Sequence, residues 1–279
     1  MTSINAGAGD DVTDPKNELV PTHQVASWAE FHTFIEGTVF ATDAEEQQQT
    51  YIWRGQPCGD WSLMSSLDRL FVRLGVSSAA SEKTAARHLE EFQYASRGRR
   101  RGLSPRDLSE NEWWALGQHF GLATPLLDWS RSPFAAAYFA FEDATSRTEY
   151  RVVYGLDTNA VRQRNAEIDS GESIESGRAP VLEIIDPMAD ENPRLVSQGA
   201  LFTRAPLGMT VESWVAGAFE GTATQPLIRI EIPDAERARC LRALNRMNIN
   251  HLSLFPDLSG ATRYSNLRTE LAPHQKSEL

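Results

Sequence analysis

Large apolar side chains recur at helical spacing in five stretches of the chain. Steps of three and four residues predict helices over 28–35, 80–96, 110–120, 133–144 and 234–247. Ser27 is placed to cap the first of these helices, and Pro133 takes the favoured first position of the fourth. The last helix is basic and amphipathic, with Leu241 and Leu244 directed inward.

Short β-prone runs predict strands over 51–56, 150–156, 181–185, 199–203 and 226–232. A further short strand is expected between Gly121 and the helix that begins at Pro133. Residues 160–178 are polar and interrupted by glycine, which predicts a surface excursion, and the arginine-rich stretch 97–106 predicts a loop. Helices followed by several short strands are typical of an α+β fold.

Charge and composition narrow the class of protein. The 279 residues carry a formal net charge of -11, which argues against coating duplex nucleic acid through bulk positive charge. Residues 1–50 hold nine acids and one lysine, so most of the net negative charge lies there, and a local basic groove in the remainder of the chain stays open as an interpretation. The chain is expected to divide into a disordered acidic tail at 1–21, one domain at 22–270 and a C-terminal tail at 271–279.

Cysteine usage and hydropathy favour a cytoplasmic protein. Cys58 and Cys240 form neither a disulfide framework nor a zinc motif, so we expect reduced thiols and no metal. No apolar stretch is long enough to cross a membrane, and no signal peptide is recognisable.

Three separated groups of polar residues carry candidate chemistry. Trp53-Arg54-Gly55-Gln56 places an arginine at a strand rim, where its fork could bind a phosphate or a carboxylate and the glycine would let that ligand approach the backbone. The second group, between 118 and 140, holds His119, Thr124, Asp128 and Ser130 among apolar residues. The third is Gln198-Gly199 at the start of a strand. Each group also has a structural interpretation: a surface arginine, a core histidine, a helix cap at Asp128 or Ser130, and a β-turn.

Taken in series, these motifs resemble the FRG family of bacterial proteins, which is named for an aromatic-Arg-Gly motif. The resemblance extends over about residues 25–268 and rests on several motifs in the expected order. They are Trp53-Arg54-Gly55-Gln56, Ser62 to Arg69, Gln118-His119-Phe120-Gly121, Thr124 to Ser130 with Pro133, Gln198 to Phe202, and Leu254 to Leu258.

A more distant resemblance is to ADP-ribosyltransferases, which carry an arginine, then Ser-Thr-Ser, then a glutamate. Arg54 falls on the arginine, and Asp128 and Ser130 fall on the first and last positions of the second motif. Gln198 stands where the glutamate is expected. This resemblance implies an α+β single domain of ADP-ribosyltransferase-like type, with small mixed or antiparallel sheets and with N-terminal and flanking helices.

The same resemblance implies NAD as the substrate, no metal, and transfer of ADP-ribose to a macromolecular acceptor, either protein or RNA. The NAD-binding residues would be Arg54, Gly55, Gln56, Thr124 and Ser130. An effector of this class is a bacterial toxin or phage-defence protein, and it implies an antitoxin or regulatory partner.

The catalytic residues would be Asp128, Gln198 and His119. Asp128 would supply negative charge or accept a proton, Gln198 would hydrogen-bond a ribose hydroxyl, and His119 would orient the ribose or act as the base. We expect these three residues to line one cleft with Arg54 and Ser130. Because an amide replaces the usual glutamate, two alternatives stay open beside the mono-ADP-ribosyltransferase: a non-catalytic nucleotide- or nucleic-acid-binding module, and a purely structural partner domain.

Overall fold

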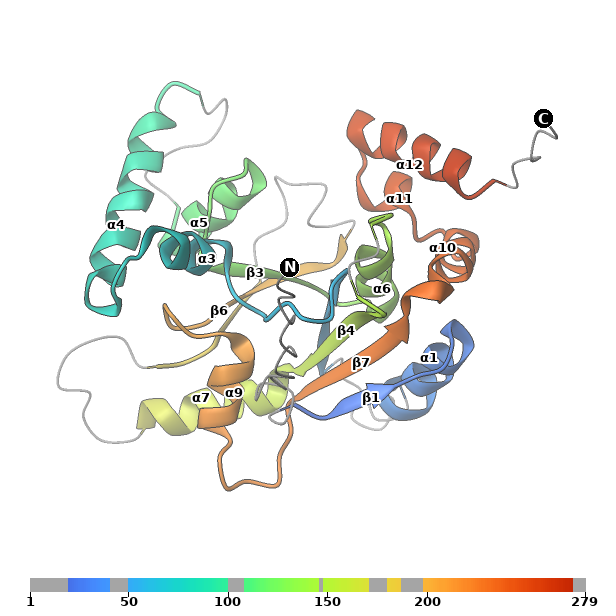
Figure 1. Cartoon of the computed structure of the whole chain (residues 1–279). Helices are drawn as coiled ribbons and strands as arrows, with labels where there is room; N and C mark the ends of the chain where they lie inside the picture. Colours follow the sequence, from blue (N-terminus) through green and yellow to red (C-terminus); the bar gives the residue numbers. More distant parts are fainter. Residues whose placement is uncertain are drawn as a thin grey trace, which may run out of the picture.

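The computed structural model describes residues 20–40, 50–99, 108–145, 148–170, 180–186 and 198–272. Nearly all of the two predicted tails, and most of the arginine-rich stretch 97–106, lie outside these residues. The described strands form one seven-stranded sheet in the order β1-β7-β4-β2-β3-β6-β5 (Figure 1). Their bounds are β1 Thr22–Gln24, β2 Tyr51–Gln56, β3 Leu126–Ser130, β4 Tyr150–Asp157, β5 Glu183–Ile185, β6 Ala200–Arg204 and β7 Leu227–Pro233.

The sheet is mixed, because β1 runs parallel to β7 while every other neighbouring pair is antiparallel. The α+β prediction is therefore confirmed at this coarse level. The expectation of several small sheets is wrong, since β6 and β5 continue the ladder beyond β3. One continuous sheet lets both of its faces be covered by helices.

The described α-helices largely match the predicted ones where apolar periodicity is strong. Their bounds are α1 Trp28–Phe34, α3 Ser66–Leu74, α4 Ser78–Ala95, α5 Glu110–His119, α6 Pro133–Phe141, α7 Thr158–Ser170, α9 Val211–Ala218, α10 Arg237–Arg246, α11 His251–Leu254 and α12 Leu258–Glu270. The cap at Ser27 is confirmed, because its side chain accepts a hydrogen bond from the Glu30 N–H. Leu241 and Leu244 of α10 are buried as predicted.

Helix α7 corrects the surface excursion predicted for 160–178 as far as Ser170, and residues 171–178 lie outside the described part of the chain. The carboxylate of Asp157 accepts hydrogen bonds from the N–H groups of Asn159 and Ala160, which satisfies two free donors of the first turn. Val161 is the one fully buried apolar side chain of the helix, so the apolar periodicity is too weak to be read from the sequence.

Helices cover the two faces of the sheet separately. On one face α1, α6 and α10 enclose a core that includes Trp53 and Ile230, while on the other α7 and α9 pack over Ile52, Leu127 and Trp129. A third cluster joins α3, α4 and α5 to Leu126 of β3 and Phe202 of β6. None of the described helices combines the length and apolar character that crossing a bilayer requires.

Gly55 marks the closest approach of a helix to the sheet. A Cβ atom at this position would lie 1.9 Å from the carbonyl oxygen of Ala136 and 2.7 Å from the backbone nitrogen of Ala140. Both contacts are with the backbone of α6, which cannot move aside as a flexible side chain could. The glycine therefore admits α6, rather than a ligand as the sequence suggested.

The C-terminal helices are attached to α6 through a buried polar contact. The Tyr138 hydroxyl lies 2.5 Å from Nδ1 of His251, and Nε2 of His251 lies 3.4 Å from a carboxylate oxygen of Glu142. Burial lowers the pKa of His251 to about 4, with the positive charge of Arg263 acting in the same direction. Burial also raises the pKa of Glu142 to about 6. At pH 7 the imidazole is therefore neutral, and Tyr138 donates to it.

Gly55→Ala should lower the free energy of unfolding by at least about 2 kcal/mol, because the added methyl forces α6 away from β2. Urea denaturation followed by circular dichroism measures this loss. Gly217→Ala in α9 is the matched control, since a Cβ there meets no atom within 4 Å. That control should be neutral or slightly stabilising, and equal stabilities for the two variants would contradict the close approach of α6.

The stability difference between wild type and His251→Gln should depend on pH. The folded-state pKa of His251 lies below its unfolded value of about 6.5, so its contribution to stability is lost as the pH falls below 6.5. Wild type should therefore lose about 2 kcal/mol relative to the variant between about pH 7 and pH 5. The raised pKa of Glu142 changes stability in the opposite direction as the pH falls. The measured quantity is therefore the difference between the unfolding free energies of wild type and His251→Gln at each pH, obtained by urea denaturation. A pH-independent difference would contradict burial of a neutral imidazole.

Candidate functional site

Strands β2 and β3 separate immediately after they meet. Trp53 and Ser130 form their registered pair, whereas β2 pairs with β4 along its whole length. Paired side chains share a face, so Ser130 lies on the face that α6 covers, and Arg54 leaves β2 on the opposite face. The side chain of Arg54 then reaches across to the point where β3 diverges.

Arg54 is held at this opening by Asp128. Its Nη1 donates to the backbone carbonyl oxygen of Asp128 at 2.7 Å and lies 4.0 Å from a carboxylate oxygen of the same residue. The side chain is 22% exposed, and its buried Nε has no hydrogen-bond acceptor among the described residues. Burial lowers the pKa of Arg54 from its usual range, while the charge of Asp128 opposes that shift. Arg54 is thus a largely buried cation, not the rim residue that the sequence suggested.

Asp128 presents its carboxylate to solvent in a fixed orientation. Its side chain is 63% exposed, and Oδ1 accepts a hydrogen bond of 2.7 Å from Nε2 of Gln118 in α5. The Thr124 hydroxyl donates to the other end of the Gln118 amide. Because that bond occupies the amide oxygen, the NH₂ group is directed to Asp128. Gln118 was part of a recognised motif, but the sequence did not identify it as a site residue.

Thr124 is hydrogen-bonded to Gln118 and to the start of α3. It is fully buried, and its backbone is attached to the start of α3, where its N–H donates to the Ser66 hydroxyl at 2.9 Å and its carbonyl accepts from the Leu67 N–H at 3.0 Å. The residue predicted to bind NAD therefore positions the side chain that orients Asp128.

Ser130 and Gln198 form a second contact, further along β3. The Ser130 hydroxyl donates to the backbone carbonyl of Gln198 at 2.7 Å and accepts from the Ser132 N–H at 3.1 Å. Nε2 of Gln198 donates to the carbonyl oxygen of Leu254 at 3.1 Å. Ser130 is 3% exposed, so its hydroxyl serves the backbone in this structure.

The alternative of a helix cap at Asp128 or Ser130 is wrong. The N-cap of α6 is Ser132, whose side chain accepts from the Ala135 N–H at 3.2 Å, and Pro133 follows at the first helical position. Asp128 lies within β3, where its carboxylate accepts from Gln118 and its carbonyl accepts from Arg54 rather than from an N–H of α6. The exposed carboxylate therefore has no capping role.

The remaining predicted residues fall into different environments. His119, the last residue of α5, is exposed with its ring 4.8 Å from that of Phe120, so it is not a core histidine. Gln56 is buried, with Oε1 lacking a donor among the described residues, and Gly55 lies beneath α6. The contacts thus connect Arg54 with Asp128, and Ser130 with Gln198, rather than joining all five expected residues in one cleft.

Three further residues act electrostatically on Arg54 and were not identified from the sequence. Arg69 lowers the pKa of Arg54, whereas Glu212 and Tyr154 raise it. Tyr154 of β4 is the registered partner of Arg54 on β2, and burial raises the pKa of Tyr154 itself. The signal that could have found Tyr154 is register: two strands that pair along their length place a tyrosine beside the arginine.

The side chains that commonly ligate metals do not gather in the described part of the chain. No group of three or more His, Cys, Asp or Glu side chains there is arranged to hold a metal ion. Both cysteines are free and buried.

Comparison with known proteins identifies one family. Residues 49–149 match the family model of the FRG domain. Neither the curated proteins nor the solved structures yielded a match to the chain. The matched segment runs from just before β2 to just before β4, so it contains Arg54, Gln118, Thr124, Asp128 and Ser130, whereas Gln198 lies outside it. By this match, the chain carries an FRG domain.

Proposed function

We propose that the chain is an NAD-dependent ADP-ribosyltransferase-like protein whose reacting centre lies at Arg54 and Asp128. The observation that carries the proposal is the pairing of a largely buried arginine with an exposed, oriented carboxylate where β2 and β3 separate. A cation with an unused buried donor favours an anionic ligand, and the pyrophosphate of NAD is one.

Arg54 would bind the pyrophosphate. Its Nη1 is already bonded to the Asp128 carbonyl, which fixes the plane of the guanidinium. Binding an anion would offset the desolvation that lowers the pKa of Arg54. Arginine suits this task better than lysine because its planar fork matches phosphate oxygens.

Asp128 would stabilise the positive charge that develops on the ribose. When the glycosidic C–N bond breaks, its electron pair goes to the nicotinamide nitrogen, and the ribose becomes cation-like. A nucleophilic atom of the acceptor then bonds to the ribose carbon and loses its proton to a base. A carboxylate held by Gln118 at 2.7 Å is preorganised for the first task and can accept that proton. His119, exposed at the end of the same helix as Gln118, is the other candidate base.

Two observations favour a second candidate, the non-catalytic nucleotide-binding module. Gln198 uses its amide to donate to Leu254, which is a structural contact, and Ser130 is buried on the face opposite to Arg54. In the proposed function, Gln198 and Ser130 therefore stabilise the fold around the site and do not contact NAD. Transfer to a protein or RNA acceptor, a role as a bacterial toxin or phage-defence effector, and control by an antitoxin all rest on the resemblance alone. A cytoplasmic location rests on the cysteine usage of the sequence.

Incubation of the purified protein with NAD labelled in the adenylate, together with a bacterial lysate, separates the candidates. Label in protein or in RNA, with release of nicotinamide, is the expected result and identifies the acceptor. NAD binding without nicotinamide release would support the non-catalytic module. Absence of both binding and release would overturn the two candidates together.

Arg54→Lys should weaken NAD binding at least about tenfold, or about 1.4 kcal/mol, because an ammonium cannot reproduce the fork. Titration calorimetry measures the affinity. Arg87→Lys on the exposed surface of α4, where the arginine pairs with Glu91, is the matched control and should bind as wild type does. Full affinity in Arg54→Lys would exclude bidentate recognition of phosphate.

Asp128→Asn should lower the rate of nicotinamide release at least about tenfold while leaving stability nearly unchanged. The asparagine oxygen can still accept from Gln118, but it carries no charge and is not a base. Gln198→Glu should not raise the rate, because a carboxylate cannot donate to the Leu254 carbonyl as the amide does. Wild-type turnover in Asp128→Asn would show that the negative charge comes from elsewhere.

A further inference from the structure

The motif from Ser62 to Arg69 forms the turn that leads into α3 and the first turn of that helix. The Ser66 hydroxyl donates to the Thr124 carbonyl oxygen at 3.2 Å and accepts from the Thr124 N–H at 2.9 Å. Thr124 belongs to the segment that leads into β3. The start of α3 is thus attached to the strand that carries Asp128.

A second set of contacts fixes the same motif to α9. The Leu63 N–H donates to Oε1 of Glu212 at 2.7 Å, and the Leu63 carbonyl oxygen accepts from the Val211 N–H at 3.1 Å. Glu212 is also one of the charges that act on Arg54. The motif is therefore held by β3 and α9, the two elements that supply Asp128 and Glu212 to the surroundings of Arg54.

Arg69 ends the motif with a guanidinium that pairs with no carboxylate in the described part of the chain. The residue is exposed, and its Nη1 donates to the Met64 carbonyl oxygen at 2.5 Å. Nη1 of Arg54 is held in the same way, by the Asp128 carbonyl oxygen at 2.7 Å. One backbone carbonyl thus fixes each guanidinium, and the other nitrogens have no acceptor among the described residues.

The two guanidiniums lie close enough to repel each other. Burial is the main reason why the pKa of Arg54 is lowered, and the positive charge of Arg69 acts in the same direction, while Asp128 and Glu212 oppose it. An exposed arginine can extend into water, which screens like charges. Arg69 instead folds back to Met64, and this contact keeps its charge beside Arg54.

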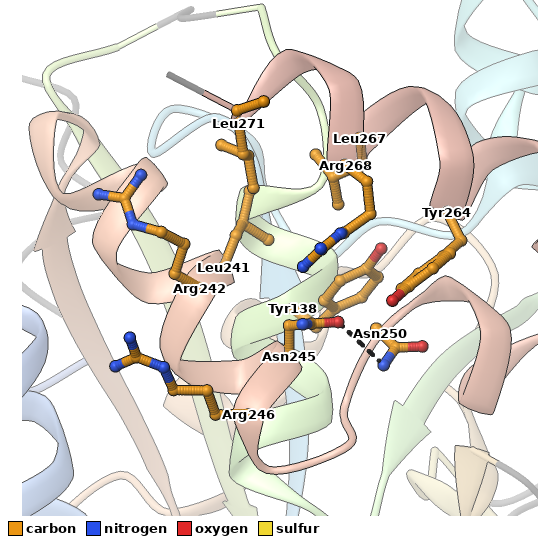
Figure 2. A pocket seen from close by; sticks show the side chains of 11 residues that line it. Tyr138, Leu241, Arg242, Asn245, Arg246, Asn250, Tyr264, Leu267, Arg268 and Leu271 are labelled. Atoms are coloured by element: carbon orange, nitrogen blue, oxygen red, sulfur yellow. Dashed lines mark hydrogen bonds between the residues drawn. The ribbon is translucent and has the colours of Figure 1, made fainter.

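A cavity of about 310 Å³ between α10 and α12 provides a contrast (Figure 2). Arg242, Arg246 and Arg268 line it, but Figure 2 shows Arg242 and Arg246 extending away from Arg268. Within the described residues, no hydrogen bond or ion pair fixes any of these three guanidiniums. Positive charge alone therefore does not make a phosphate site, and the carbonyl anchors distinguish Arg54 and Arg69.

We propose that Arg54 and Arg69 together bind a diphosphate, with one phosphate group at each guanidinium. The assignment of Arg69 rests on the proposed function and adds a selectivity to it: ligands with two linked phosphate groups, such as NAD and ADP, bind in preference to monophosphates. Each phosphate accepts from the donors that the carbonyl anchors leave unused. The negative charge of the diphosphate offsets the repulsion between the two cations. Asp128 is left for the ribose.

Titration calorimetry of the full chain with ADP and AMP, in a buffer without phosphate, measures this selectivity. Wild type should bind ADP at least about tenfold more tightly than AMP, because only ADP can occupy both guanidiniums. In Arg69→Gln the two affinities should differ by less than about threefold, since the second phosphate has lost its partner. An unchanged ratio in Arg69→Gln, or equal affinities in wild type, would overturn the inference.

Arg73→Gln is the matched control. Arg73 lies one turn further along α3, is exposed, and is not among the charges that act on Arg54. Its ratio of ADP to AMP affinity should equal that of wild type, and an equal loss in this variant would show that net charge determines the selectivity. Arg69→Lys keeps the charge without the fork, so its ratio should lie between those of wild type and Arg69→Gln.

A merely structural role for Arg69 gives a different result. If Arg69 only holds the Met64 carbonyl, its substitution weakens ADP and AMP binding equally and leaves their ratio unchanged. Circular dichroism and the urea midpoint of each variant report any loss of structure. An unchanged ratio with lowered stability would therefore assign Arg69 to the fold and overturn its contact with the ligand.

The inference and the proposed function fail separately. Weakened ADP binding in Arg54→Lys, with an unchanged ratio in Arg69→Gln, would overturn the role of Arg69 and leave the proposed function standing. Selective ADP binding that depends on Arg69, in a protein that releases no nicotinamide from NAD, would support the diphosphate site and contradict the transferase. A wild-type protein that binds neither ADP nor NAD would overturn both.

Discussion

The contact of α6 with β2 at Gly55 is the constraint on which the other parts of the structure depend. The helix can lie this close only because one position of the strand lacks a side chain and because the helix surface is built from buried alanines, including Ala136 and Ala140. On its other side α6 carries Tyr138 and Glu142, to which His251 is attached. Both the sheet and the C-terminal helices are thus positioned by a single short helix.

The separation of β2 from β3 explains why an arginine stands at this point. Where a ladder stops, the backbone groups that would have been paired need other partners. The carbonyl of Asp128 obtains one from Nη1 of Arg54 instead of from the neighbouring strand. The same bond holds the guanidinium at the opening, so a structural requirement of the sheet places a cation beside an exposed carboxylate.

The sequence predicted the elements whose burial is regular and failed where it is not. Helix α10 and the start of α6 at Pro133 were predicted correctly, because apolar spacing and proline position are local signals. Helix α7 was missed because Val161 alone carries its fully buried apolar contact. Site residues were harder, since residue type does not reveal exposure: Thr124 proved to be buried and His119 exposed.

Register supplies what residue type cannot. That Gly55 meets a helix and that Arg54 and Ser130 leave the sheet on opposite faces follow from contacts between segments that are distant in the sequence. Motif order placed these residues in one series along the chain. It carried no information on which face of the sheet each side chain occupies.

The FRG segment cannot form this sheet from its own residues. It contributes β2 and β3, whose registered contact is the pair Trp53 and Ser130, and two strands joined so briefly are marginal by themselves. Six registered pairs with β4 and five with β6 hold the two strands in place, and both partners lie outside the matched residues. The separation of β2 from β3 at Arg54 therefore results from their other neighbours, because β2 pairs with β4 and β3 pairs with β6. It follows that the candidate chemistry resides in the FRG segment, whereas its geometry is set by the remainder of the chain.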